Sequence, residues 1–362
     1  MSAVMTATGQ QVDVWIGTDT TGGSPSRGVY HLTLDDSSGV LSESSLAAEA
    51  EKPGFLARHP KLDVLYSTSP QGVVAWRIVR SGGGPPKLEK LNERESGDGS
   101  STHVSVDPTG GVLLSAQYGG GSVASYPLKE DGSIGMRTSL LKHDQPSGVV
   151  ADRQDACHPH SVFTTPDNRY AVVPDLGADR VFVHKLDPGS ARLMPHGSVA
   201  TPAGSGPRHL KFHPSGKWGY VVNELAMSVT ALAYNADAGE LTMIETVPTL
   251  SQAQIDHERS NTAGEIRVHP TGRFLYASNR GHDSVTVFAI DDATGKLKQV
   301  QVEPIRGSWP RNFGLSPSGK WLLAAGADSH TVAAFEINPQ SGALQFIRQS
   351  AYVPSPICVE FE

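Results

Sequence analysis

Residues that can transfer protons or bind anions recur at related places along this 362-residue sequence. Four of them combine an imidazole, a carboxylate and two guanidinium groups, namely His160, Arg208, Glu224 and Arg280. An imidazole or a carboxylate can act as a general base and return the proton afterwards. Arginine binds phosphate and carboxylate through two parallel hydrogen bonds, and it can stabilise a developing oxyanion. If the fold brings these residues together, they form a candidate catalytic group for an acidic substrate.

Each of these residues has a fixed place in a repeated phrase, in which an apolar strand is followed by a proline, a tight turn and a second apolar strand. Clear copies are RHLKFHPSGKWGYVVNE, GEIRVHPTGRFLYASNR and RNFGLSPSGKWLLAAGA. The anchor prolines of the copies are Pro60, Pro108, Pro166, Pro214, Pro270 and Pro317. The four candidate residues lie either six positions before an anchor proline or ten positions after it.

The repeat predicts an all-β fold. After each copy come two further short strands, so that each unit holds four strands in about 50 residues. Apolar residues alternate with period two, which is typical of strands. The turn between the first two strands suits its residues, because Pro presets φ and Gly tolerates positive φ. Such units predict a β-propeller with four antiparallel strands per blade.

The two ends of the chain fit together as one further unit. The C-terminal PICVEFE matches the first strand of a copy, and the N-terminal VDVWIGTDTTGG matches a second strand that has no first. We expect the C-terminal strand to join the N-terminal blade, which closes the ring and leaves no open edge. Six internal copies and one shared blade predict a seven-bladed β-propeller, which forms a single domain over residues 11–362 after a flexible N-terminal segment, residues 1–10.

In a propeller blade, the start of the first strand and the end of the second lie on the same face of the ring. The candidate catalytic residues are therefore expected at one mouth of the central channel, together with a second polar set. That set, assigned to substrate binding, consists of His103, Tyr118, His209, Arg311 and Asp19. Ionisable groups that converge on one cavity are candidates for a functional site, and the alternative is that they are structural residues of the rim. Longer inserts, predicted to be loops, lie at 81–99, 143–157 and 249–263.

The composition limits the classes of protein. Asp and Glu outnumber Lys and Arg by 37 to 30, and the net charge of −7 argues against binding to nucleic acid or to an anionic membrane. The sequence shows neither an apolar stretch long enough for a transmembrane helix nor a secretory signal. Two cysteines, Cys157 and Cys358, are too few for a disulfide framework. We expect a cytoplasmic protein.

One short segment, Cys157-His158-x-His160, contains residue types that bind metals. Its spacing is not that of a zinc finger, and the sequence offers no CxxC partner. A Gly-x-Ser-x-Gly nucleophile motif is also lacking. We therefore expect no metal, no cofactor and no serine nucleophile.

Several segments resemble the seven-bladed propeller lactonase family, which includes bacterial 6-phosphogluconolactonases and fungal 3-carboxy-cis,cis-muconate lactonizing enzymes. The segments that carry the resemblance are His158-Pro159-His160-Ser161-Val162, Gly206-Pro207-Arg208-His209, Val221-Val222-Asn223-Glu224-Leu225, Ser278-Asn279-Arg280-Gly281, Pro310-Arg311-Asn312-Phe313, Ile16-Gly17-Thr18 and Pro356-Ile357-Cys358-Val359. The resemblance covers essentially the whole chain. It implies that the same four residues form the family's His, Arg, Glu, Arg set.

The resemblance implies an enzyme that hydrolyses a sugar lactone, with 6-phosphogluconolactone of the pentose phosphate pathway as the expected substrate. We expect Glu224 to act as the base, with His160 as a proton shuttle or orienting group. Arg208, Arg280 and Arg311 would divide between the oxyanion and the phosphorylated or carboxylated tail. Two alternatives remain open, a muconate-type cycloisomerase that uses the same site and a non-enzymatic propeller that binds a partner.

Overall fold

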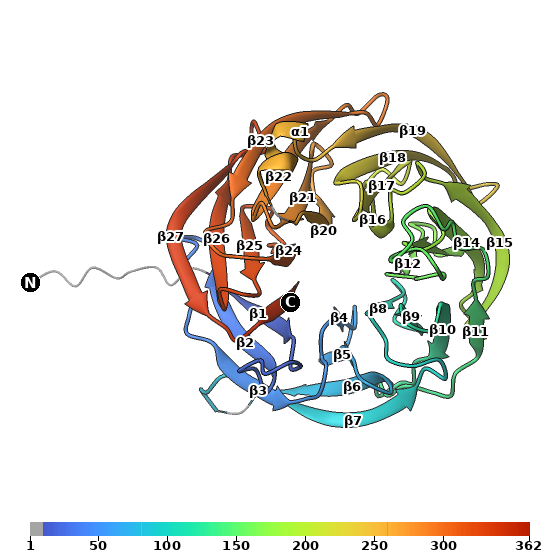
Figure 1. The fold of residues 1–362 in the computed structure, drawn as a ribbon. Helices are drawn as coiled ribbons and strands as arrows, with labels where there is room; N and C mark the ends of the chain where they lie inside the picture. Colours follow the sequence, from blue (N-terminus) through green and yellow to red (C-terminus); the bar gives the residue numbers. More distant parts are fainter. Residues whose placement is uncertain (1–9, 81, 259) are drawn as a thin grey trace, which may run out of the picture.

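Seven four-stranded antiparallel sheets surround one central axis in the computed structural model, which describes residues 10–80, 82–258 and 260–362 (Figure 1). The innermost strand of each sheet faces the axis, and the outermost strand lies at the rim of the ring (Figure 1). The predicted seven-bladed β-propeller with four strands per blade is therefore confirmed. Of the N-terminal segment that was predicted to be flexible, residues 1–9 lie outside the described residues.

The first four blades, with strands given from the axis outward, include the one built from both chain ends. Blade 1 consists of β28 (Pro356–Phe361), β1 (Gln11–Thr18), β2 (Gly28–Asp35) and β3 (Ser45–Glu49). Blade 2 consists of β4 (Leu56–Arg58), β5 (Val64–Thr68), β6 (Gly72–Val79) and β7 (Lys87–Glu95). Blade 3 consists of β8 (His103–Val106), β9 (Val112–Gln117), β10 (Ser122–Pro127) and β11 (Ser139–Lys142). Blade 4 consists of β12 (Phe163–Thr164), β13 (Tyr170–Asp175), β14 (Arg180–Asp187) and β15 (Arg192–Ala200).

The other three blades follow the same order. Blade 5 consists of β16 (Pro207–Phe212), β17 (Trp218–Asn223), β18 (Ser228–Asn235) and β19 (Glu240–Pro248). Blade 6 consists of β20 (Thr262–Val268), β21 (Phe274–Arg280), β22 (Ser284–Ile290) and β23 (Leu297–Pro304). Blade 7 consists of β24 (Pro310–Leu315), β25 (Trp321–Gly326), β26 (Thr331–Ile337) and β27 (Leu344–Tyr352).

Two of the three inserts that were predicted to be loops contain regular structure. Residues 81–99 include the outer strand β7, whose charged sequence is largely exposed or half-buried and lacks the apolar alternation of the inner strands. Residues 249–263 include a short helix, α1 (Gln252–His257), which begins at a capping box between Ser251 and Gln254. The third insert, residues 143–157, is irregular as predicted.

The ring closes through the pairing of its two chain ends. β28 runs antiparallel to β1, with Val359 opposite Ile16 and Phe361 opposite Val14. Ile16, Val14 and Val359 are buried in one apolar cluster with residues of blade 7. The predicted closure is confirmed, and burial of apolar surface favours it at about 25 cal/mol per Å².

A histidine just before the anchor proline connects neighbouring blades. Each of these histidines places Nε2 within hydrogen-bonding distance of a glycine carbonyl in the next blade's turn, in the pairs His59–Gly110 (3.1 Å), His213–Gly272 (2.9 Å) and His269–Gly319 (2.8 Å). Gly272 has a φ of 76°, and a Cβ there would lie 2.4 Å from Nε2 of His213. Glycine is therefore required both by the turn and by the close approach of the histidine.

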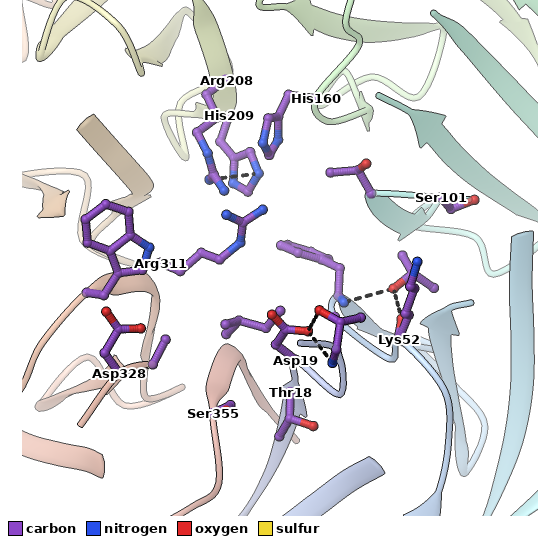
Figure 2. A pocket seen from close by; sticks show the side chains of 18 residues that line it. Thr18, Asp19, Lys52, Ser101, His160, Arg208, His209, Arg311, Asp328 and Ser355 are labelled. Atoms are coloured by element: carbon purple, nitrogen blue, oxygen red, sulfur yellow. Dashed lines mark hydrogen bonds between the residues drawn. The ribbon is translucent and has the colours of Figure 1, made fainter. Parts of the chain in front are cut away.

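The innermost strands are interrupted by bulges where candidate site residues lie. The neighbours of Arg208 pair with Asn223 and Val222 of β17, so Arg208 itself has no partner in the ladder. Arg311 is left out of the pairing between β24 and β25 in the same way. A bulge adds one residue to a strand and changes the direction of its side chain. These bulges allow long cationic side chains to extend into the mouth of the channel (Figure 2).

The histidine contacts between blades predict a measurable loss of stability. His213→Ala leaves the Gly272 carbonyl without its donor and is expected to lower the free energy of unfolding by about 1–3 kcal/mol. Urea denaturation followed by tryptophan fluorescence measures the change. His257→Ala is the matched control, because that side chain on α1 is 86% exposed. Equal urea midpoints for the two variants would contradict a role of this contact in joining the blades.

Candidate active site

A cavity of about 430 Å³ opens at one mouth of the central channel (Figure 2). The repeat position six residues before the anchor proline supplies five of its lining residues, namely Gly54, Thr102, His160, Arg208 and Arg311. Five blades thus contribute the same position to one cavity, as the sequence predicted. Asp19 and His209 from the predicted set also line it.

Glu224 is the centre of the charged cluster beside this cavity. Its side chain follows β17, is 6% exposed and is bound by three arginines. Oε2 accepts a hydrogen bond from Nε of Arg208 at 3.0 Å and forms an ion pair with Nη2 of Arg280 at 2.9 Å. Oε1 accepts one from Nη2 of Arg153 at 2.6 Å. Burial by itself would raise the pKa of Glu224, but the charges of Arg280 and Arg208 and the bond from Arg153 outweigh it and hold the pKa well below its usual range.

Arg208 is held rigidly at the cavity wall. Its Nη1 donates to the Gly264 carbonyl at 2.8 Å and lies 3.2 Å from Nε2 of His209. Burial, together with the positive charges of Arg280 and Arg311, lowers the pKa of Arg208 to about 9, so the group still carries its charge at neutral pH. Fixed donors of this kind can stabilise an oxyanion without reorganising during the reaction.

His160 lies at the wall of the cavity beside Glu224, with 3.9 Å between its Nε2 and Oε2 of the carboxylate. Burial is the largest cause that holds the pKa of His160 well below its ordinary value, followed by the charges of Arg208 and His209. The imidazole is therefore neutral at pH 7 and able to accept a proton. Within the described residues, its Nδ1 is buried without a hydrogen-bond partner, so no neighbour fixes the tautomer.

The contacts of Glu224 bear on its predicted role as the general base. Its carboxylate is paired with three guanidinium groups, which hold it in the ionised form and lower its pKa. His160 has a free nitrogen at the cavity and is neutral, as a base must be before it acts. Both residues therefore stay candidates for proton transfer, and Glu224 also pairs with the three arginines.

Two predicted substrate-binding residues lie outside the cavity lining. His103 is completely buried, and its ring lies 4.1 Å from that of Phe55 and 4.5 Å from that of Phe163. Its ring therefore packs against aromatic side chains, and it is not among the residues that line the cavity. Tyr118 stacks on His158 at 4.3 Å and contacts His160 edge-on, so it forms a wall behind the histidine.

Several residues of the site were not found by sequence reasoning. Lys52, Trp309 and Asp328 line the cavity, and Arg153 reaches Glu224 from the irregular segment 143–157. These residues come from connections between strands, which do not follow the repeat. The length of that insert was the one available signal for Arg153.

The described part of the chain holds no group of three or more His, Cys, Asp and Glu side chains placed to bind a metal ion. Within the segment Cys157-His158-x-His160, burial raises the pKa of the Cys157 thiol to about 11, and Nδ1 of His158 lies 2.8 Å from the Tyr118 carbonyl. Among the helices of the described residues, none has the length and apolar character needed to span a membrane.

Comparison with known proteins agrees with the fold. Residues 13–361 match the family model described as lactonase, 7-bladed beta-propeller. The 6-phosphogluconolactonase of Bacillus subtilis (strain 168) is 37% identical over 287 residues, which cover 78% of this chain and 79% of that protein. The chain therefore belongs to the seven-bladed β-propeller lactonase family, and its enzyme class is that of the lactone hydrolases.

Solved structures agree with this assignment. The Pseudomonas aeruginosa periplasmic gluconolactonase, PpgL, has a TM-score of 0.86 and 30% identity, with 97% of this chain and 99% of that chain covered. A protein from Lactobacillus plantarum has a TM-score of 0.89 at 30% identity, with coverage of 98% and 100%. The agreement extends around the whole ring, including the blade that both chain ends form.

The charge on Glu224 predicts a pH-dependent effect on stability. Because its pKa is lowered in the folded state, the ionised carboxylate contributes stability above its ordinary pKa, and this contribution is lost as the solution is acidified. Glu224→Gln is therefore expected to lower the free energy of unfolding by about 3 kcal/mol at pH 7. The difference from the unmodified protein should shrink steadily between pH 5 and about pH 3.5, where urea denaturation can compare them. A difference that stays constant with pH would contradict the assignment of charge.

Proposed function

We propose that this protein hydrolyses 6-phosphogluconolactone to 6-phosphogluconate. The observation that carries the proposal is a free guanidinium in the same cavity as a neutral histidine and a fixed arginine. Within the described residues, the guanidinium of Arg311 has no hydrogen bond or ion pair with another side chain or with the backbone, and it extends into the cavity (Figure 2). Such a group suits a ligand that brings its own negative charge. The likeness to the Bacillus 6-phosphogluconolactonase supports the same substrate.

The cavity offers different partners for different parts of such a substrate. Arg311, with Lys52 on the same cavity, provides positive charge for the phosphate. Asp19 and Asp328 line the opposite side from Arg208 and can accept hydrogen bonds from sugar hydroxyls (Figure 2). The ring carbonyl would then lie against Arg208 and the neighbouring histidine.

The proposed reaction has two steps. Water attacks the lactone carbonyl carbon as it gives a proton to Nε2 of His160, and the carbonyl electron pair moves to the oxygen, which Arg208 stabilises. The imidazolium formed is stabilised by the Glu224 carboxylate at 3.9 Å. In the second step the tetrahedral intermediate breaks the bond to the ring oxygen, which takes the proton from His160. The product is the open-chain hydroxy acid, and the histidine returns to its neutral state.

The two alternative functions have less support. The Bacillus relative is named as a 6-phosphogluconolactonase and the Pseudomonas structure as a gluconolactonase, so neither name points to a muconate cycloisomerase. A buried set of charged groups around a cavity favours a small acidic substrate over a protein partner, which usually binds through aromatic hot spots. A role in the pentose phosphate pathway follows from the proposed substrate, and a cytoplasmic location stays a prediction from the sequence.

Arg311 should determine the preference for a phosphorylated lactone. Arg311→Met removes a charge-assisted contact of about 1.5–3 kcal/mol, so KM for 6-phosphogluconolactone should rise by about 10- to 100-fold. KM for glucono-δ-lactone should change by less than about 3-fold, since that substrate has no phosphate. Initial rates on both lactones, corrected for spontaneous hydrolysis, measure the difference. Lys320→Met, which removes an exposed charge from the same blade, is the control. An equal loss on both substrates would contradict the phosphate assignment.

His160 should set the acid side of the pH profile. Because a base must be neutral, kcat/KM is expected to fall as the pH drops through the lowered pKa of His160 and to stay level above it. His160→Gln should lower kcat by about 100-fold or more and remove this acid limb. Assays between about pH 4.5 and pH 7, where spontaneous hydrolysis is slow enough to subtract, test both effects. A variant that keeps the acid limb of the unmodified enzyme would exclude His160 as the base.

A further inference from the structure

The two oxygens of Glu224 have different kinds of partner. Oε2 is bound by Arg208 and Arg280, which belong to strands of the repeat. Oε1 is bound by Arg153, and among the described residues this is the one recorded partner of that oxygen. Arg153 lies in the segment between β11 and β12, which is unrelated to the repeat. A residue outside the repeated architecture thus completes the carboxylate's hydrogen bonding.

The segment that carries Arg153 is fixed to the body of the propeller. The neighbouring residue, Gln154, is completely buried and donates from Nε2 to the Leu176 carbonyl at 2.8 Å and to Oδ1 of Asp179 at 2.7 Å. The same oxygen of Asp179 accepts from the backbone N–H of Gly206, two residues before Arg208. One buried carboxylate therefore connects the segment to the start of β16.

Arg153 itself lies between the buried carboxylate and solvent. Its side chain is 36% exposed, whereas that of Glu224 is 6% exposed. Its Nη2 also lies 3.5 Å from the hydroxyl of Tyr118, whose ring stacks on His158. The position of the Arg153 guanidinium is thus limited by Tyr118 on one side and by the fixed backbone at Gln154. Removal of this partly exposed group leaves the anchor at Gln154 and Asp179 intact.

We propose that Arg153 is a positioning residue for lactone hydrolysis. It holds Oε1 of Glu224, so that Oε2 stays directed at Arg208 and Arg280 and the fixed arginine keeps its orientation toward the cavity. Without Arg153, the carboxylate is free to rotate toward water, and the donor that stabilises the oxyanion loses its support. This inference rests on the proposed function, because it assigns a task within that reaction.

The charges around Glu224 allow a test of the proposal that does not depend on stability, namely the position of the acid limb in the pH profile. The groups that face the carboxylate come from four elements, and they are Arg208 of β16, Arg280 of β21, His160 before β12 and Arg153 itself. Arg311 of β24 adds positive charge next to the two strand arginines. Loss of one cation makes protonation easier for both Glu224 and His160. The acid limb of the pH profile should therefore move to higher pH when Arg153 is neutralised.

The experiment compares the unmodified enzyme with Arg153→Met, Arg153→Lys and the control Arg180→Met on 6-phosphogluconolactone. Arg180 belongs to the same blade as the segment's end, and its guanidinium contacts Ser198 in an exposed position outside the site. Arg153→Met should lower kcat by about 10- to 100-fold, change KM by less than about 3-fold and shift the acid limb upward. Arg153→Lys should restore the position of the acid limb and part of kcat, because it restores the charge without the planar fork. The control should match the unmodified enzyme.

Three results would overturn the inference. An unchanged kcat in Arg153→Met would show that the contact with Oε1 is dispensable. A fall in kcat with no shift of the acid limb would show a structural contribution alone. A rise in KM as the main effect would place Arg153 in substrate binding instead. The failure of the proposed function looks different, because the unmodified enzyme would then show no turnover above the spontaneous rate.

Discussion

One buried carboxylate allows three guanidinium groups to occupy the same corner of the propeller. Arg208 and Arg280 come from adjacent blades and their like charges repel each other, but both pair with Oε2 of Glu224, Arg208 through a hydrogen bond and Arg280 through an ion pair. With Arg153 on the other oxygen, the cluster carries more positive than negative charge. The carboxylate therefore stabilises the cluster and still leaves it with a net positive charge that attracts an anionic ligand. A simple ion pair of one positive and one negative charge would have no net charge to do so.

The repeat explains how much of this could be predicted from sequence. A turn of constant form places the position six residues before the anchor proline at the same height in every blade, so the residues there, such as His160, Arg208 and Arg311, were found without coordinates. Arg153 and Lys52 were missed because their places depend on how irregular connections pack. The burial of His103 among aromatic rings was likewise not predictable, because it depends on Phe55 and Phe163 from the two neighbouring blades.

The types of the residues indicated acid–base chemistry, but their contacts could be seen only in the structure. From the sequence, Glu224 and His160 were both candidates for the base, since each type can accept a proton. The structure gives them different surroundings, because the carboxylate is paired with three arginines while the imidazole lines the cavity and is neutral. The partners of the Glu224 carboxylate come from different blades and from an irregular connection, and local sequence patterns do not specify which of them will meet.

Closure of the ring and formation of the cavity are one structural event. The backbone N–H of Asp19, just after β1, donates to the Ser355 carbonyl, just before β28, at 2.9 Å. Both residues line the cavity, together with Ile357 from the bulge in the closing strand. One wall of the site is therefore built where the two ends of the chain meet. Since a propeller with an unpaired first blade lacks this wall, the site is complete only when the whole chain has folded, and activity reports directly on closure.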